Sequence, residues 1–226
     1  MTQNNCKYCS FHTELAEILS DDCFEQLSAN HAVVSFVKGD SIIKQGALST
    51  NVVFLRKGLV KIHLAGPSRE QIVRLVKAPT YLGLPTTLGD KINQYSVSAV
   101  SNVEVCFIDI NVFQNLLQKN HTFAYRIILE LCRNDIESYQ RCANRTQKQS
   151  RGNLAEVLLD FSNCIFESDS FMLPVSQTEL GCLIDTGRES ISRFLNEFVK
   201  DGIISLIGKQ ITILKKDILQ LVSNNG

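Results

Sequence analysis

The chain has 226 residues, enough for two domains, and its 44% hydrophobic and 20% charged residues are ordinary for a globular protein. The 23 Lys and Arg residues balance the 23 Asp and Glu residues, which excludes the overall basic charge of a generic nucleic-acid binder. No apolar run approaches about eighteen residues, and Met1–Asn5 is polar, so we expect no membrane span or export signal and predict a cytoplasmic protein. We expect its eight cysteines to be thiols or ligands rather than disulfides.

Residues 1–22 form a predicted amino-terminal extension that contains Cys6 and Cys9 in a Cys-x-x-Cys spacing. This spacing is typical of a metal site, of a surface thiol pair or of a thiol–disulfide couple. A thiol–disulfide enzyme also needs a βαβ context, which the neighbouring sequence lacks. We therefore predict no enzymatic activity, and we expect the first helix to begin near Leu19.

Residues 23–118 are predicted to form a β-rich domain, because short β-branched runs alternate with turn residues at a spacing of about ten residues. Within residues 60–64, Val, Ile and Leu alternate with Lys and His, which predicts one buried and one solvated face and places His63 at the surface. A similar alternation in residues 103–107 places Cys106 opposite the buried face. The spacing favours a sandwich or barrel.

Residues 119–149 are predicted to be one long helix, since the stretch from about residue 121 contains neither Gly nor Pro. Its candidate dimer-interface residues recur at spacings of three and four, a heptad pattern, and are Leu129, Cys132, Ile136, Tyr139 and Ala143. This stripe is longer than one β domain covers, so we expect a second copy to bury it. The alternative is a helix packed only on its own β domain, because about three heptads is near the minimum for a coiled coil.

Residues 150–226 contain two capping-box patterns, Ser176 with Glu179 and Thr186 with Glu189. They predict two helix starts in close succession. The residues 185–187 between them, Asp-Thr-Gly, are typical of a turn. So short a first helix followed by a turn predicts a steep crossing, as in a helix-turn-helix.

The second of these helices, residues 187–199, is expected to be the recognition helix. At about 100° per residue its polar side chains share one face, and they are Arg188, Glu189, Ser192, Arg193 and Asn196. Arginine can pair with guanine and glutamate with cytosine in the major groove of DNA. The alternative is a merely solvated face with Arg–Glu pairs. Glu189 has two possible roles, because it could also cap the helix.

After this helix, two β-branched runs surround a short turn at residues 207–209, which predicts a hairpin and hence a winged helix. Lys209 in the turn can reach a phosphate. The full set of side chains that we expect at the DNA is Ser176, Thr186, Arg188, Glu189, Ser192, Arg193 and Lys209.

With Thr-Gly-Arg-Glu-Ser-Ile-Ser-Arg-Phe-Leu at residues 186–195, the chain resembles the bacterial CRP/FNR transcription regulators over nearly its whole length. The resemblance implies an α+β protein with an amino-terminal double-stranded β-helix (jelly-roll) sensor domain of the cyclic-nucleotide-binding type, a long dimerisation helix and a carboxy-terminal winged helix-turn-helix. It also implies a homodimer that binds a palindromic TGTGA-like or TTGAT-like site and recruits or blocks RNA polymerase.

The resemblance places an effector pocket around Tyr81, Gly83, Leu84, Gln94 and Tyr95. Cyclic-nucleotide binders of the family carry a Gly-Glu pair for the ribose and an Arg-Ser pair for the phosphate. Aligned through Gly83, this chain has Leu84 in place of the glutamate and Gln94-Tyr95 in place of Arg-Ser. A buried phosphate without a cationic partner is badly desolvated, so we expect an effector other than cyclic AMP, and the same pocket could hold a more apolar molecule.

The oxygen-sensing branch of the family binds a [4Fe-4S] cluster through four cysteines, three of them in an amino-terminal extension. Cys6, Cys9 and Cys106 match three of these positions, whereas the remaining one would need His12 or Cys23. Cys106 is equally an ordinary small core residue. The alternative function is therefore a redox or metal sensor that uses these cysteines. A further alternative is a sensor whose winged helix contacts proteins rather than DNA.

Overall fold

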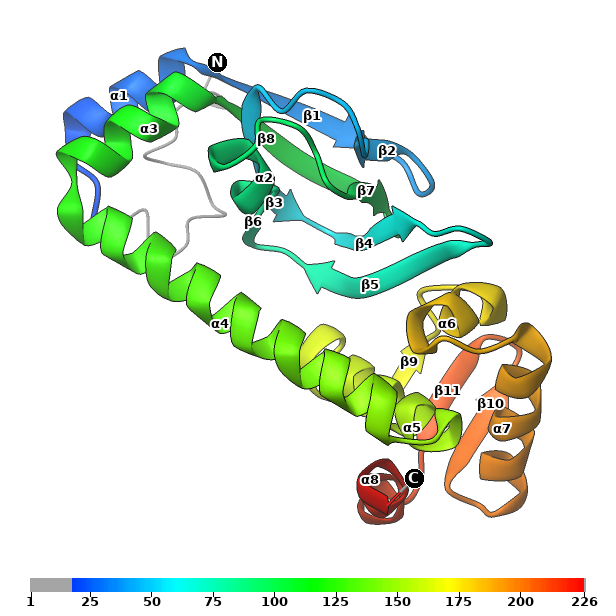
Figure 1. The fold of residues 1–226 in the computed structure, drawn as a ribbon. Helices are drawn as coiled ribbons and strands as arrows, with labels where there is room; N and C mark the ends of the chain where they lie inside the picture. Colours follow the sequence, from blue (N-terminus) through cyan, green and yellow to red (C-terminus); the bar gives the residue numbers. More distant parts are fainter. Residues whose placement is uncertain (1–17, 226) are drawn as a thin grey trace. The chain divides into compact units, whose positions relative to one another are not determined.

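The computed structural model describes residues 18–225, and Cys6, Cys9 and His12 lie outside them (Figure 1). The chain divides into two compact units. Of the described residues, the first unit comprises 18–65 and 74–136, and the second comprises 66–73 and 137–225. Among the described residues, no helix is long and apolar enough to cross a membrane.

The first unit is built on antiparallel strands in two sheets, as expected for a jelly roll. One sheet has the order β1 (His31–Phe36), β8 (Val103–Asp109), β3 (Asn51–Lys57) and β6 (Thr80–Leu82). The other has the order β2 (Ser41–Ile43), β7 (Ser96–Ala99), β4 (Leu59–Ala65) and β5 (Glu70–Lys77), whose first residues belong to the second unit. The predicted β-rich domain is confirmed.

Three short helices accompany these sheets: α1 (Asp21–Ala29), α2 (Leu84–Leu88) and α3 (Ile110–Lys119). The Ser20 hydroxyl caps α1 by accepting a hydrogen bond from the backbone N–H of Cys23. Phe113 of α3 packs in one hydrophobic cluster with Phe123 and Ile127, which belong to the first turns of the next helix. The burial of these three side chains fixes the start of that helix to the first unit.

Two side chains of the β domain differ from the simple alternating pattern. His63 is half-buried, and its Nε2 lies 2.9 Å from the hydroxyl of Ser98 on the neighbouring strand, so it is not simply a surface residue. Cys106 and its neighbour Val105 point to opposite faces of strand β8, yet both side chains are buried. Strand β8 is covered on both faces here, which alternation in the sequence alone does not reveal.

The long helix α4 spans His121–Gln147, within the predicted range. It is followed in the second unit by α5 (Ser150–Asp160), a short π-helical turn (Phe161–Ile165), β9 (Ser170–Met172), α6 (Gln177–Ile184), α7 (Arg188–Lys200), β10 (Ile204–Ile207), β11 (Gln210–Ile213) and α8 (Lys216–Asn225). Strands β10 and β11 form the predicted hairpin. Strand β9, which the sequence analysis did not predict, extends that hairpin to three strands.

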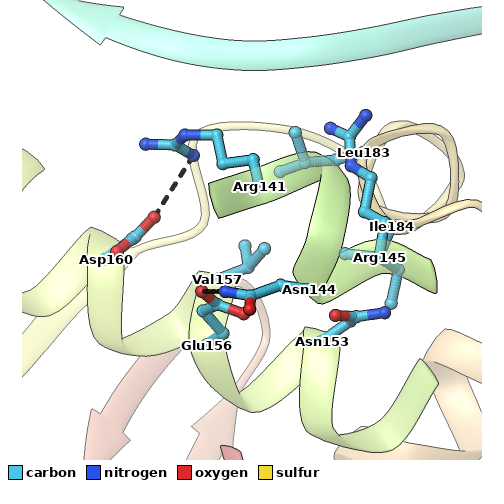
Figure 2. A pocket seen from close by; sticks show the side chains of 9 residues that line it. All are labelled: Arg141, Asn144, Arg145, Asn153, Glu156, Val157, Asp160, Leu183 and Ile184. Carbon is cyan, nitrogen blue, oxygen red and sulfur yellow. Dashed lines mark hydrogen bonds and ion pairs between the residues drawn. The ribbon is translucent and has the colours of Figure 1, made fainter. Parts of the chain in front are cut away.

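A small open pocket of about 40 Å³, room for a few water molecules, lies between α4, α5 and the end of α6 (Figure 2). Polar side chains from α4 and α5 cross it. Arg141 forms a 3.4 Å ion pair with Asp160, and the Asn144 amide donates to Glu156 across 2.6 Å. Lys148 adds a 2.9 Å ion pair to Glu156. These contacts tie the end of α4 to the helix that begins the winged-helix region.

Candidate nucleic-acid interface and effector pocket

The predicted cap of α6 is confirmed. The Ser176 hydroxyl accepts from the backbone N–H of Glu179 at 3.2 Å, and the Glu179 carboxylate accepts from the backbone N–H of Ser176 at 2.9 Å. The helix ends at Asp185, which adopts a left-handed conformation with φ 59° and ψ 47°. This residue redirects the chain into the next helix.

The second predicted capping box is wrong. Helix α7 is capped by Gly187, with no side-chain hydrogen bond, so Thr186 lies one position too early to be the cap. The turn that begins at the left-handed Asp185 runs to Gly187, whose backbone is extended with φ −82° and ψ 156°, so the helix starts only at Arg188. Glu189 therefore stands at the second helical position rather than the third and is exposed, which removes its capping role.

Helix α7 has two contrasting faces. Ile191, Leu195 and Phe198 are fully buried. The exposed side chains of the opposite face are Arg188, Glu189, Arg193 and Asn196, with Ser192 half-buried between them. The polar face is thus available to a partner while the apolar face anchors the helix.

Arg193 lies at the centre of this face, and 66% of its side chain is exposed. Its guanidinium lies over the Phe194 ring, 5.0 Å from the centroid, and 3.8 Å from the carboxylate of Glu197. An exposed pair of this length contributes little to stability, so the guanidinium can exchange Glu197 for another acceptor. A surface hollow on α7 is lined by Glu189, Ser192, Arg193, Asn196, Glu197 and Lys200. Sequence reasoning missed Glu197 and Lys200, although both continue the same helical face.

The remaining expected DNA contacts surround this helix. Lys209 is exposed at the turn of the β10–β11 hairpin, where Gly208 has φ 61°. Ser176 is exposed at the start of α6, and Thr186 is half-buried in the turn before α7. The second unit thus presents hydroxyl and ammonium groups on the elements that flank the recognition helix.

The residues expected around an effector lie at the α2 end of the first unit, and most of them are covered. Tyr81 packs on Phe54 and Phe113, with ring centroids 4.9 and 5.6 Å apart. Gly83 has φ 77° and leads into α2, whose first residue, Leu84, is buried. These side chains therefore contribute to the core as well as to any pocket.

The positions that hold the phosphate in cyclic-nucleotide binders carry no cation here. Gln94 is exposed and donates to Asp90 across 3.3 Å. Burial raises the pKa of the Tyr95 phenol above its ordinary value, an effect that the Gly83 backbone N–H and Arg74 partly oppose. Tyr95 therefore offers a neutral hydroxyl at physiological pH.

Two polar contacts that sequence reasoning missed join strands β5 and β6 to α4. The Thr80 hydroxyl donates to Glu130 across 3.2 Å, and the Arg74 guanidinium donates to the Asn134 amide oxygen across 2.9 Å. Burial raises the pKa of Glu130, although Thr80 and nearby guanidinium groups partly oppose the shift. The sequence shows that α4 carries polar residues such as Glu130 and Asn134, but it does not show that Thr80 and Arg74 are their partners.

The candidate dimer surface is an exposed apolar stripe on α4. Large hydrophobic side chains remain 54–66% exposed at Tyr125, Ile128, Ile136 and Tyr139. Of the other expected seam residues, Cys132 and Ala143 are exposed, whereas Leu129 is half-buried. The exposed stripe thus begins earlier, at Tyr125, than the heptad pattern indicated.

The cysteines of the described part do not assemble into a metal site. Cys23 and Cys106 both belong to the hydrophobic cluster of the first unit. Within residues 18–225, no three His, Cys, Asp or Glu side chains gather where they could hold a metal ion. The redox alternative therefore depends on Cys6 and Cys9, which lie outside the described residues.

Comparison with known proteins agrees with this architecture. Residues 33–120 match the family described as cyclic nucleotide-binding domain, and residues 152–222 match the Crp-like helix-turn-helix domain. The fumarate and nitrate reduction regulatory protein of Vibrio cholerae is 27% identical over 183 residues, which cover 78% of this chain and 72% of that protein. The cAMP-activated global transcriptional regulator CRP of Escherichia coli O157:H7 is 20% identical over 200 residues, covering 86% and 95%.

Among solved structures, FixK2 from Bradyrhizobium japonicum has the same fold, with a TM-score of 0.78 at 16% identity over 85% of this chain and 96% of that chain. A β-roll of the cyclic-nucleotide-binding type, a long helix and a winged helix-turn-helix define a DNA-binding transcription regulator rather than an enzyme. The chain belongs to the CRP/FNR family, whose regulators are typically dimeric.

Proposed function

We propose that this regulator binds, as a homodimer, a palindromic DNA site of the TGTGA or TTGAT type through helix α7. The observation that carries the proposal is the division of α7 into a fully buried apolar face and an exposed face with two arginines, a glutamate and an asparagine. These are the side chains that pair with base edges in the major groove.

The individual roles follow from side-chain chemistry. Arg188 and Arg193 can each form two hydrogen bonds to guanine O6 and N7, and Glu189 can accept from cytosine N4. Because Glu189 does not cap the helix, its carboxylate is free of that competing role. The hydroxyl and ammonium groups that flank α7 belong to Ser176, Thr186 and Lys209, and we assign them to the DNA backbone. Ser192 lies on the polar face of α7 itself, and we assign its hydroxyl to a base edge.

A second copy of the chain is the expected partner of the exposed α4 stripe. Ile128, Ile136 and Tyr139 are large apolar side chains exposed along one side of the helix, and association would remove them from water. A twofold dimer supplies two α7 helices, and two half-sites about one turn of DNA apart match such a pair. By family resemblance, RNA polymerase is the downstream partner.

The effector is proposed to be a molecule other than cyclic AMP. Leu84 is buried where a ribose-binding glutamate would stand, and Gln94 and Tyr95 supply no cation for a phosphate. The Thr80–Glu130 hydrogen bond connects strand β6 with α4. A ligand that changes this contact would act directly on the helix that we expect to dimerise.

The proposal is tested by the affinity of the protein for its selected site and for random duplexes, with Arg193→Ala beside the parent. Loss of a base contact costs about 1–3 kcal/mol at the selected site and relaxes the base preference at one position of each half-site. Lys44→Ala, which removes an exposed cation of the first unit, is the matched control and should bind both kinds of duplex like the parent. An equal loss of affinity on selected and random DNA would reduce Arg193 to a phosphate contact and contradict its assigned role.

A further inference from the structure

A short segment distant in sequence contacts the helix-turn-helix. Residues 66–73 lie between β4 and the middle of β5 and belong to the second unit. Arg145 of α4 donates to the backbone carbonyls of residues 72–73 at 3.1 and 2.7 Å. Gln71 donates its amide to the carbonyl of Cys182, in α6, across 2.5 Å. The segment is thus held at both α4 and α6.

Arg69 extends this contact to the turn that precedes the recognition helix. One of its guanidinium nitrogens donates to the carbonyl of Thr186 across 3.0 Å, and the other forms an ion pair with the carboxylate of Asp185. Arg69 precedes Thr186 by 117 residues, so this cation is supplied from outside the helix-turn-helix motif.

The charge of Asp185 explains why this contact matters for DNA. Its side chain is 70% exposed, and it lies only two residues before Gly187, the cap of α7. Because no side chain caps α7, the N–H groups of its first turn are available to a DNA phosphate. An unpaired carboxylate beside that position would repel the same phosphate.

We propose that Arg69 is a positioning residue for DNA binding, which neutralises Asp185 so that α7 can approach the DNA backbone. The inference rests on the proposed function and deepens it by adding a residue from outside the helix-turn-helix. Arg69 acts through Asp185 and reads no base, so its effect is the same for every DNA sequence.

The test measures affinity for the selected site and for a random duplex with the full-length parent, Arg69→Ala, Asp185→Asn and the double variant. Asparagine keeps the left-handed conformation accessible while it removes the charge. Arg69→Ala is expected to bind both duplexes about three- to tenfold more weakly, with unchanged base preference. The double variant should recover to within about twofold of Asp185→Asn, since no carboxylate remains to be neutralised.

Lys44→Ala, an exposed cation of the first unit, is the charge-matched control and should bind like the parent. The inference is overturned if Arg69→Ala binds as tightly as the parent or more tightly, because the contact then has no supporting role or an inhibitory one. It is also overturned if the double variant stays as weak as Arg69→Ala, because Arg69 would then touch phosphate itself. A parent that selects no DNA sequence would instead refute the proposed function.

Discussion

Helices α4 and α7 are both amphipathic, but their exposed faces are of opposite character. Helix α7 buries Ile191, Leu195 and Phe198 and exposes charged side chains around Arg193. Helix α4 buries only Phe123 and Ile127 and leaves Ile136 and other large apolar side chains in water. The polar face is suited to a wet, charged partner such as DNA, whereas the apolar face is suited to a protein surface of the same kind.

The largest loss of stability is expected when a buried side chain of α7 is removed. Phe198→Ala removes a fully buried ring that also stacks with Arg151, whose guanidinium carbon lies 4.9 Å from the ring centroid. We expect a loss of about 3–5 kcal/mol in the free energy of unfolding of the second unit, measured by urea titration. Asn196→Ala on the exposed face should cost less than about 0.5 kcal/mol. Equal losses for the two variants would contradict the assignment of the two faces.

The second change places a charge on the apolar face of α4. Ile136→Asp would bury a carboxylate without a partner in a dimer, which is expected to weaken the dimer by at least about 2 kcal/mol, or about thirtyfold in its dissociation constant. Sedimentation equilibrium measures this shift. Ser138→Asp adds the same charge to an exposed position on the opposite side of the helix from Ile136 and should leave assembly unchanged. A dimer that tolerates Ile136→Asp would show that another surface joins the copies.

The smallest effect on stability is expected at the contact between α4 and α5, where Asp160 pairs with Arg141. Burial raises the pKa of Asp160, although Arg141 partly opposes the shift. A carboxyl group with a raised folded-state pKa disfavours folding when ionised, so the parent should gain stability relative to Asp160→Asn as the pH falls through that pKa. Because the Asp160 side chain is 41% exposed, we expect the difference to stay within about 0.5 kcal/mol. Urea midpoints at several pH values would reveal it, and a parent that loses stability relative to the variant on acidification would contradict the sign.

Much of this arrangement could be predicted, because short sequence patterns determine it. The buried and exposed faces of α7 follow from helical periodicity, and the cap of α6 follows from Ser176 and Glu179. The start of α7 was predicted one residue too early, because the left-handed conformation of Asp185 is set by the turn as a whole. No pattern in the sequence separates such a turn from a second capping box.

Other features depend on contacts that the sequence does not encode locally. Strand β9 has three residues, too few for an alternating pattern, and it forms only against β11. The contact of Arg69 with Asp185 joins residues 116 positions apart. The effector positions around Leu84 could be aligned with the family, but their role in the core became visible only with the packing of α2.

The central claim is that two α7 helices, presented by a dimer, read a palindromic site. It is tested most directly by selecting bound duplexes from a random pool with the full-length protein, in the presence and absence of air. We predict enrichment of two inverted TGTGA-like or TTGAT-like half-sites whose centres lie about one turn of DNA apart. Enrichment of a single half-site without its inverted copy, or of no sequence under either condition, would contradict the account.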